Sequence, residues 1–175
     1  MPAAAGRTER WHMMILKWMV VVVAVGLLLL VVGAQLGLLE GRPRAALGVK
    51  DGRLARPSPT PNSVSSQADL WPGHPQRGHA QIAALAIRGD GASTIRRLKE
   101  VISAMPGARV VEQRDDYLYA QFRSRWLKFV DDAEFWFDPQ AGVVQVRSAS
   151  RLGRKDFGVN RARIESLRQR LAESP

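Results

Sequence analysis

The stretch "KFVDDAEFWFDPQAGVVQVRSAS" (Lys128–Ser150) consists of two alternating segments separated by a turn, Asp138-Pro-Gln-Ala-Gly142. Successive side chains of a β-strand point to opposite faces, so the first segment separates a mainly aromatic face from a mainly acidic one. One face carries Phe129, Asp131, Ala133, Phe135 and Phe137. The other carries Val130, Asp132, Glu134, Trp136 and Asp138. The pattern predicts a hairpin with one buried apolar face.

Two further strands are predicted directly before this hairpin. They are "ARVVEQ" (108–113) and "YLYAQFRS" (117–124), separated by the hairpin-like break "RDD". Because the connections between all four segments are short, an antiparallel meander is expected.

Helical spacing of apolar residues appears on both sides of the four strands. Ser93 or Thr94 is expected to cap a first helix that ends at Pro106-Gly107, and a last helix is expected over 160–172. Their apolar stripes are Ile95, Leu98, Ile102 and Met105 in the first helix and Ile164, Leu167 and Leu171 in the last. With both helices on one sheet face, the fold class is an α+β two-layer domain of order α-β-β-β-β-α. The preceding stretch "AQIAALAI" (80–87) is either a short strand or a single turn.

A long apolar run, "WMVVVVAVGLLLLVVGAQLGLL", occupies residues 18–39. As a helix it extends roughly 33 Å at about 1.5 Å per residue, enough to cross the hydrocarbon core of a bilayer. The predicted organisation is therefore a basic tail over 1–17, a transmembrane helix over 18–39, a linker and strap over 40–79 and the α+β domain over 80–175. The Pro/Ser-rich segment 56–67 reads as an extended linker or a strap along the domain surface.

The run is predicted to be an uncleaved single-pass anchor. Cleavage near Ala34, after the small residues of Val32-Gly33-Ala34, would instead release a secreted domain. The orientation of the chain across the membrane is ambiguous, because more basic residues follow the apolar run than precede it. The positive-inside rule then places the domain in the cytoplasm, whereas a signal-anchor exports it.

Three carboxylates in "DDAEF", Asp131, Asp132 and Glu134, have two interpretations. They could perform acid/base chemistry, as in a hydrolase, or form cross-strand salt bridges with the following strand. Salt bridges from Arg147 and Arg151 are favoured. Asp131 shares a face with phenylalanines, so its charge needs a partner, which we expect to be Arg147, Arg151 or Arg161.

The segment "VRSASRLGRKDFGVNRARIESLR" (146–168) is strongly basic. Its glycines predict a strand, a turn and then a helix, with Asn160 as the expected cap and Asp156 capping or bridging. Ser148 and Ser150 lie in no nucleophile motif, so no catalytic residue is assigned. The expected ligand or partner site of this basic corner comprises Arg147, Ser148, Ser150, Arg151, Asp156, Asn160, Arg161 and Arg163 together with Asp131, Asp132 and Glu134. Arg161 and Arg163 are the preferred candidates for an external anion, beside a helix N-terminus.

Several functional classes are not expected. The chain has no cysteine, which excludes disulfides and thiolate chemistry, and its three histidines lack acidic partners at metal-ligand spacing. No metal and no cofactor is predicted. Nucleic acid is not an expected partner, because no aromatic stacking platform accompanies the basic residues.

Three motifs in order, "PNSVSSQ" (61–67), "FVDDAEFWFD" (129–138) and the basic segment 146–168, resemble the uncharacterised domain-of-unknown-function family fourteen-ninety-nine, found in bacteria and plant plastids. The resemblance covers residues 57–172 and implies no particular reaction. In that family the first motif often carries two cysteines, at positions that here are Pro57 and Ser63. Such a pair implies a disulfide and an oxidising compartment for the relatives.

That implication favours an exported domain facing the periplasm, anchored in a bacterial inner membrane. We therefore predict a membrane-anchored, non-enzymatic extracytoplasmic binding or accessory module. Its partner would be a protein or a small anionic ligand, in addition to the membrane. The alternatives are a hydrolase that uses Asp131, Asp132 or Glu134, and a structural subunit of a membrane assembly.

Overall fold

The computed structural model describes residues 5–43 and 45–173. It begins with one long helix, α1 (Ala5–Gln35), whose part from Arg10 to Gln35 is long and apolar enough to cross a membrane. The helix ends before the predicted limit at Leu39. Gly37 adopts a positive φ of 82°, and its N–H and that of Leu38 bond back to carbonyls of the last turn. This glycine ending stops the helix although the apolar sequence continues.

The four predicted strands form the predicted antiparallel meander. They are β3 (Ala108–Gln113), β4 (Tyr117–Arg123), β5 (Val130–Asp138) and β6 (Val143–Ser150). Within β4, β5 and β6 the register opposes Ala120 to Ala133 and Ala133 to Ser148. The α+β class is confirmed.

Two short strands extend the sheet beyond the meander. β1 (Ser63–Ser65) and β2 (Leu85–Ala86) both pair antiparallel with β6, giving the order β1-β6-β5-β4-β3, with β2 off this path and paired with Val143 and Val144 of β6. The linker interpretation of 56–67 therefore misses a buried strand. β1 is only three residues long and mostly serine, so it has none of the apolar alternation by which the other strands are recognised. A 3-10 turn, η1 (Ala68–Leu70), and the single-turn helix α2 (Arg77–Ala80) connect β1 to β2.

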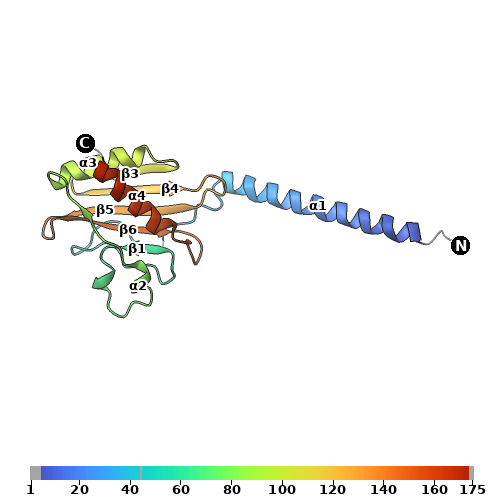
Figure 1. Cartoon of the computed structure of the whole chain (residues 1–175), viewed down its shortest axis with the longest axis horizontal. Coiled ribbons are helices and arrows are strands. Elements are labelled where there is room, and N and C mark those ends of the chain that lie inside the picture. The colour runs from blue at the N-terminus through green and yellow to red at the C-terminus, as the bar shows by residue number, and fades with distance from the viewer. Residues whose placement is uncertain (1–4, 44, 174–175) are drawn as a thin grey trace.

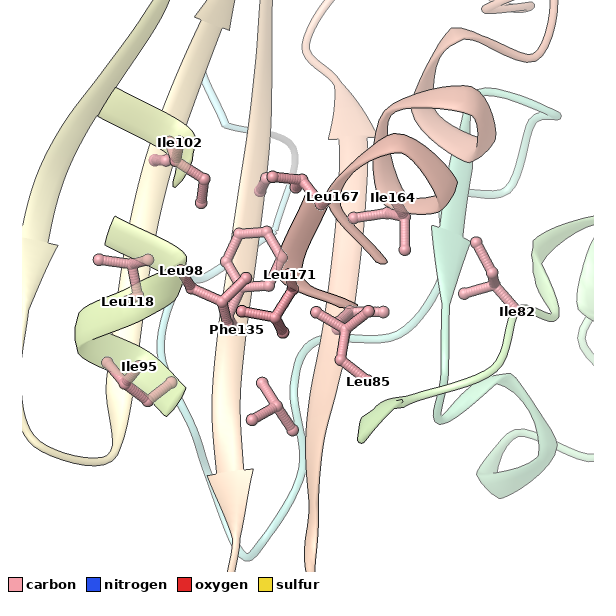
Figure 2. Close-up of a cluster of buried hydrophobic side chains, with 14 of the residues drawn as sticks. Ile82, Leu85, Ile95, Leu98, Ile102, Leu118, Phe135, Ile164, Leu167 and Leu171 are labelled. Carbon is pink, nitrogen blue, oxygen red and sulfur yellow. The ribbon is translucent and has the colours of Figure 1, made fainter. Parts of the chain in front are cut away.

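Two helices, α3 (Gly91–Ser103) and α4 (Val159–Glu173), cover one face of the sheet (Figure 1). Figure 2 shows how their apolar stripes meet over Phe135 of β5. The stripes are those predicted: Ile95, Leu98 and Ile102 from α3, and Ile164, Leu167 and Leu171 from α4. Burying side chains of this size stabilises a fold by about 1.5–3 kcal/mol each, which fixes both helices on the sheet.

The cap of α3 differs from the prediction, and of the two residues predicted at the start of the last helix it is Asp156, and not Asn160, that caps it. Asp90 caps α3: its carboxylate accepts the N–H of Ser93 at 2.7 Å, and the Ser93 hydroxyl accepts the N–H of Asp90 at 3.2 Å. Ser93 is thus the third residue of a capping box and not the cap. Asp156 caps α4 by accepting the N–H groups of Gly158 and Asn160, both at 3.1 Å.

The opposite face of the sheet is covered by the chain between α1 and β1. Leu54 from this segment is buried against Tyr117 and Tyr119 of β4, with Val49 and Trp136 packed around them. We call residues 41–58 the strap. The strap turns the polar face of the sheet into a second interior.

Candidate functional site

The polar face of the sheet holds the first of two buried ion pairs under the strap. Nη1 of Arg147 lies 3.2 Å from Oε2 of Glu134, and both side chains are almost completely buried. Oε1 of Glu134 accepts the Tyr117 hydroxyl at 2.9 Å and the N–H of Gly48 at 2.7 Å. Both carboxylate oxygens therefore have donors, as a buried charge requires. The predicted pairing of Arg147 with a carboxylate of β5 is confirmed.

Asp132 and Arg151 form the second pair. Nε and Nη2 of Arg151 donate to the two carboxylate oxygens at 2.9 and 2.8 Å, a bidentate geometry. The Tyr119 hydroxyl donates to Oδ1 of Asp132 at 2.6 Å. The hydrogen bonds to Asp132 raise the pKa of Arg151, and burial together with the bond to Asp132 raises the pKa of Tyr119. The guanidinium and the phenol therefore keep their protons at neutral pH.

Asp131 lies on the helix-covered face, as the alternation predicts, but its partner is Arg163. Nη2 of Arg163 is 2.5 Å from Oδ2 of Asp131, and the guanidinium stacks 4.5 Å from the centre of the Phe122 ring. The expectation that Arg147, Arg151 or Arg161 pairs with Asp131 is wrong. Arg147 and Arg151 point to the opposite face, and Arg161 lies elsewhere on α4. The Arg163 side chain reaches from α4 to Asp131 of β5, a contact that no local sequence pattern specifies.

Asn160 is a buried hub between α4, β6 and β1. Its Oδ1 accepts the Ser148 hydroxyl at 2.6 Å and Nη1 of Arg163 at 2.8 Å. Its amide nitrogen donates to the Ser150 hydroxyl at 3.0 Å, to Oδ2 of Asp156 at 2.8 Å and to the carbonyl of Asn62 at 3.2 Å. Asn160 therefore joins three elements, and the prediction that its side chain caps α4 is wrong.

Asp156 ties the loop between β6 and α4 to this hub. Burial by itself would raise the pKa of Asp156, but hydrogen bonds from the Asn160 side chain and from the N–H groups of Gly158 and Asn160 outweigh it and lower the pKa. The residue is thus a carboxylate at neutral pH. Its charge lies at the N-terminus of α4, where the helix dipole also favours it.

Arg161 and Arg163, the residues preferred for an external anion, donate to protein groups. Nη2 of Arg161 donates to the carbonyls of His79 and Gln81 at 2.7 and 2.8 Å, which fastens the end of α2 to α4. Arg163 is engaged with Asp131, Ser148 and Asn160 as described above. An anion at either guanidinium would compete with these contacts, whereas Lys155 in the adjacent loop is exposed.

A pocket of about 570 Å³ lies beside this corner. Its walls come from the end of α3, the adjoining ends of β4 and β5, the β6–α4 loop and the first turn of α4. Apolar lining is supplied by Met105, Phe122, Phe129, Leu152, Val159 and Ala162. The volume is within the range of small-molecule sites. No pattern in the sequence predicts this pocket, because its walls come from separate segments that only the folded chain brings together.

Three cationic side chains also line the pocket, Arg123, Lys155 and Arg163, together with the carboxylates of Asp131 and Asp156. Arg163 is paired with Asp131, and Asp156 is bonded to the N-terminus of α4. Nη2 of Arg123 pairs with Glu40 at 3.1 Å. The Nε atom of Arg123 is buried and has no hydrogen-bond acceptor in the part of the chain that the structure describes. A buried donor without an acceptor is uncommon and costly in folded proteins.

Residues 53–171 match the profile of a family described as a protein of unknown function (DUF1499). The chain belongs to this family. The resemblance seen in the three motifs is thereby confirmed, and the match runs from the strap through β1 and the sheet to α4. The DUF1499 region contains both ion pairs and the whole pocket lining, but not α1. No curated protein and no solved structure matches the chain.

Over residues 5–43 and 45–173, no group of three or more histidine and acidic side chains is arranged to hold a metal ion. Asp131, Asp132 and Glu134 of β5 are instead bound by arginines.

The buried Glu134–Arg147 pair makes a specific prediction about stability. Arg147→Met leaves the Glu134 carboxylate buried without its counter-charge, and we expect it to lower the free energy of unfolding by about 3–5 kcal/mol. Glu134→Gln in the same chain should recover most of that loss, because glutamine is uncharged and still accepts from Tyr117 and Gly48. Chemical denaturation of the full chain measures both effects.

Arg77→Met is the matched control, since the Arg77–Asp69 pair is about half exposed. We expect this substitution to cost at most about 1 kcal/mol. If Arg147→Met costs no more than Arg77→Met, or if the double variant is the least stable of the set, the pair does not have the structural role assigned to it.

Proposed function

We propose that this chain is a single-pass, membrane-anchored and non-enzymatic binding module, whose DUF1499 domain holds an amphipathic ligand with an acidic group. The observation that carries the proposal is the pocket at the α3–α4 corner. Its walls are mainly apolar, while the exposed Lys155 on the β6–α4 loop supplies a cationic donor. Such a lining fits an apolar body with one anionic or acceptor group better than it fits a small inorganic anion.

The end of the apolar run contacts the domain, and the burial of Ala34 there supports an uncleaved anchor. Ala34 is fully buried, and Nε2 of Gln35 donates to the carbonyl of Trp126 at 3.1 Å. Glu40 pairs with Arg123 at the pocket. A leader removed after Ala34 would take this buried residue away, whereas Gln35 and Glu40 would stay with the domain. We therefore favour an anchor over a secreted domain.

The side of the membrane is inferred from the signal-anchor interpretation and from the disulfide implied for relatives. We assign the domain to the periplasmic side of a bacterial inner membrane. Alkaline phosphatase fused after Pro175 should be active in intact cells, because that enzyme matures only outside the cytoplasm. A fusion that is produced at normal levels but is inactive would place the domain in the cytoplasm.

The engaged carboxylates argue against a hydrolase. Asp131, Asp132 and Glu134 each bind an arginine, and the last two also accept tyrosine hydroxyls. A general acid or base must be able to exchange a proton with substrate, and these groups are committed to neighbouring donors. This favours binding over catalysis at this site.

Photolabelling tests the pocket directly. The full chain in lipid nanodiscs is irradiated with a diazirine analogue of palmitic acid, and labelled peptides are identified by mass spectrometry. We expect labels on the β6–α4 loop and the first turn of α4. Ala162→Trp fills the pocket and should lower this labelling about tenfold, the equivalent of roughly 1.4 kcal/mol in affinity.

Ala172→Trp is the control, because Ala172 is an exposed residue of the same helix that does not line the pocket. This variant should label like the wild type. Equal labelling of the two variants, or labels found on α1 alone, would show that the pocket does not hold the probe.

A further inference from the structure

Two loops at one end of the sheet expose large apolar side chains. They are 124–129, between β4 and β5, and 151–158, between β6 and α4. Phe157 is 94% exposed and Trp126 is 68% exposed, with Phe129 and Leu152 beside the pocket mouth also exposed. Isolated apolar residues are common on protein surfaces, but a group of aromatic side chains on neighbouring loops marks an interaction surface.

The backbone at Phe157 strengthens this interpretation. Its φ is 53°, in the left-handed region that is unfavourable for side chains other than glycine, asparagine and aspartate. Its ring is almost fully exposed, so packing within the chain does not offset that strain. Strain of this kind is retained where the surrounding structure or a function requires it.

Besides Arg151, which is buried in its pair with Asp132, the same loops carry four basic residues, Arg125, Lys128, Arg154 and Lys155. None of them forms an ion pair within the described residues. The single acidic residue of the two loops, Asp156, is buried and bonded to the α4 N-terminus. The exposed part of both loops is therefore apolar and positively charged.

The position of α1 identifies what faces this surface. Figure 1 shows α1 leaving the domain at the end of the sheet where β4 and β6 end and α4 begins. The last residue of α1, Gln35, donates to the carbonyl of Trp126 in one of the two loops. If α1 crosses a bilayer, both loops lie at the level of the lipid headgroups.

We propose that Trp126, Phe129, Leu152 and Phe157, with the four basic residues, form a membrane-facing surface that rests on anionic lipid. The inference rests on the anchoring role proposed for α1. Aromatic rings favour the membrane–water interface, and lysine and arginine near the surface bind acidic headgroups. Because Leu152, Lys155 and Phe157 also line the pocket, its mouth opens toward the bilayer, and its ligand is drawn from the lipids there.

The absence of cysteine allows a clean measurement of depth. Phe157→Cys in the full chain is labelled with the fluorophore NBD and reconstituted into vesicles of phosphatidylcholine and phosphatidylglycerol. Quenching by lipids that carry a spin label near the headgroup reports how close the label lies to the bilayer. Ala141→Cys, in the exposed turn at the opposite end of the sheet, is the matched control.

We expect quenching at position 157 to exceed that at position 141 several-fold. Reversal of charge by Arg154→Glu with Lys155→Glu, or the use of phosphatidylcholine alone, should reduce the difference. Equal quenching at the two positions overturns the proposal, and strong quenching that ignores charge and lipid composition overturns its electrostatic part. Ala162→Trp is not expected to change the quenching of the label at position 157. The quenching experiment therefore tests contact with the bilayer separately from ligand binding in the pocket.

Discussion

Two buried ion pairs on the polar face of the sheet determine how the rest of the chain is arranged. Each carboxylate of β5 needs donors on all sides, because an uncompensated charge in the interior costs several kcal/mol. The strap supplies the remaining partners. Gly48 donates to Glu134, and the carbonyls of Arg56 and Gly41 accept from Arg147 and Arg151. The strap is thereby held on the sheet by the charges that it shields from water.

The end of α1 is positioned by the same contacts. Gly41 lies against Arg151, and the preceding Glu40 pairs with Arg123 at the pocket. Three residues connect Gly37, where the helix terminates, to Gly41. A tether this short leaves little freedom between helix and domain. The orientation of the loops relative to α1 therefore follows from interactions deep in the sheet.

The polar contacts of the basic corner fix the shape of the loop from 151 to 158. Asn160 holds Asp156, and Asp156 holds the start of α4, so the loop from 151 to 158 has a fixed shape. That shape forms one wall of the pocket and projects Phe157 away from the domain. Polar contacts inside the corner thus produce an apolar, cationic exterior, and ligand contacts are expected on the exterior.

Alternation and helical spacing were sufficient to predict β3 to β6, both packed helices and the two cross-strand ion pairs. Each of these depends on residues that lie close in sequence or on adjacent strands. The strand Ser63–Ser65, the Asp131–Arg163 pair and the hub at Asn160 were missed, because they depend on how distant segments cross. The cap at Asp90 was missed for a different reason, since Ser93 and Thr94 are also good capping residues and the sequence did not distinguish them.

The central claim is that a membrane lipid occupies the pocket beside the α3–α4 corner. Intermolecular nuclear Overhauser effects between lipid acyl-chain protons and methyl groups of the full chain in nanodiscs measure this contact directly. If lipid occupies the pocket, these Overhauser effects are expected at the methyl groups of Met105 and Val159, which line the pocket, in addition to the methyl groups of α1. Effects confined to α1 would contradict it.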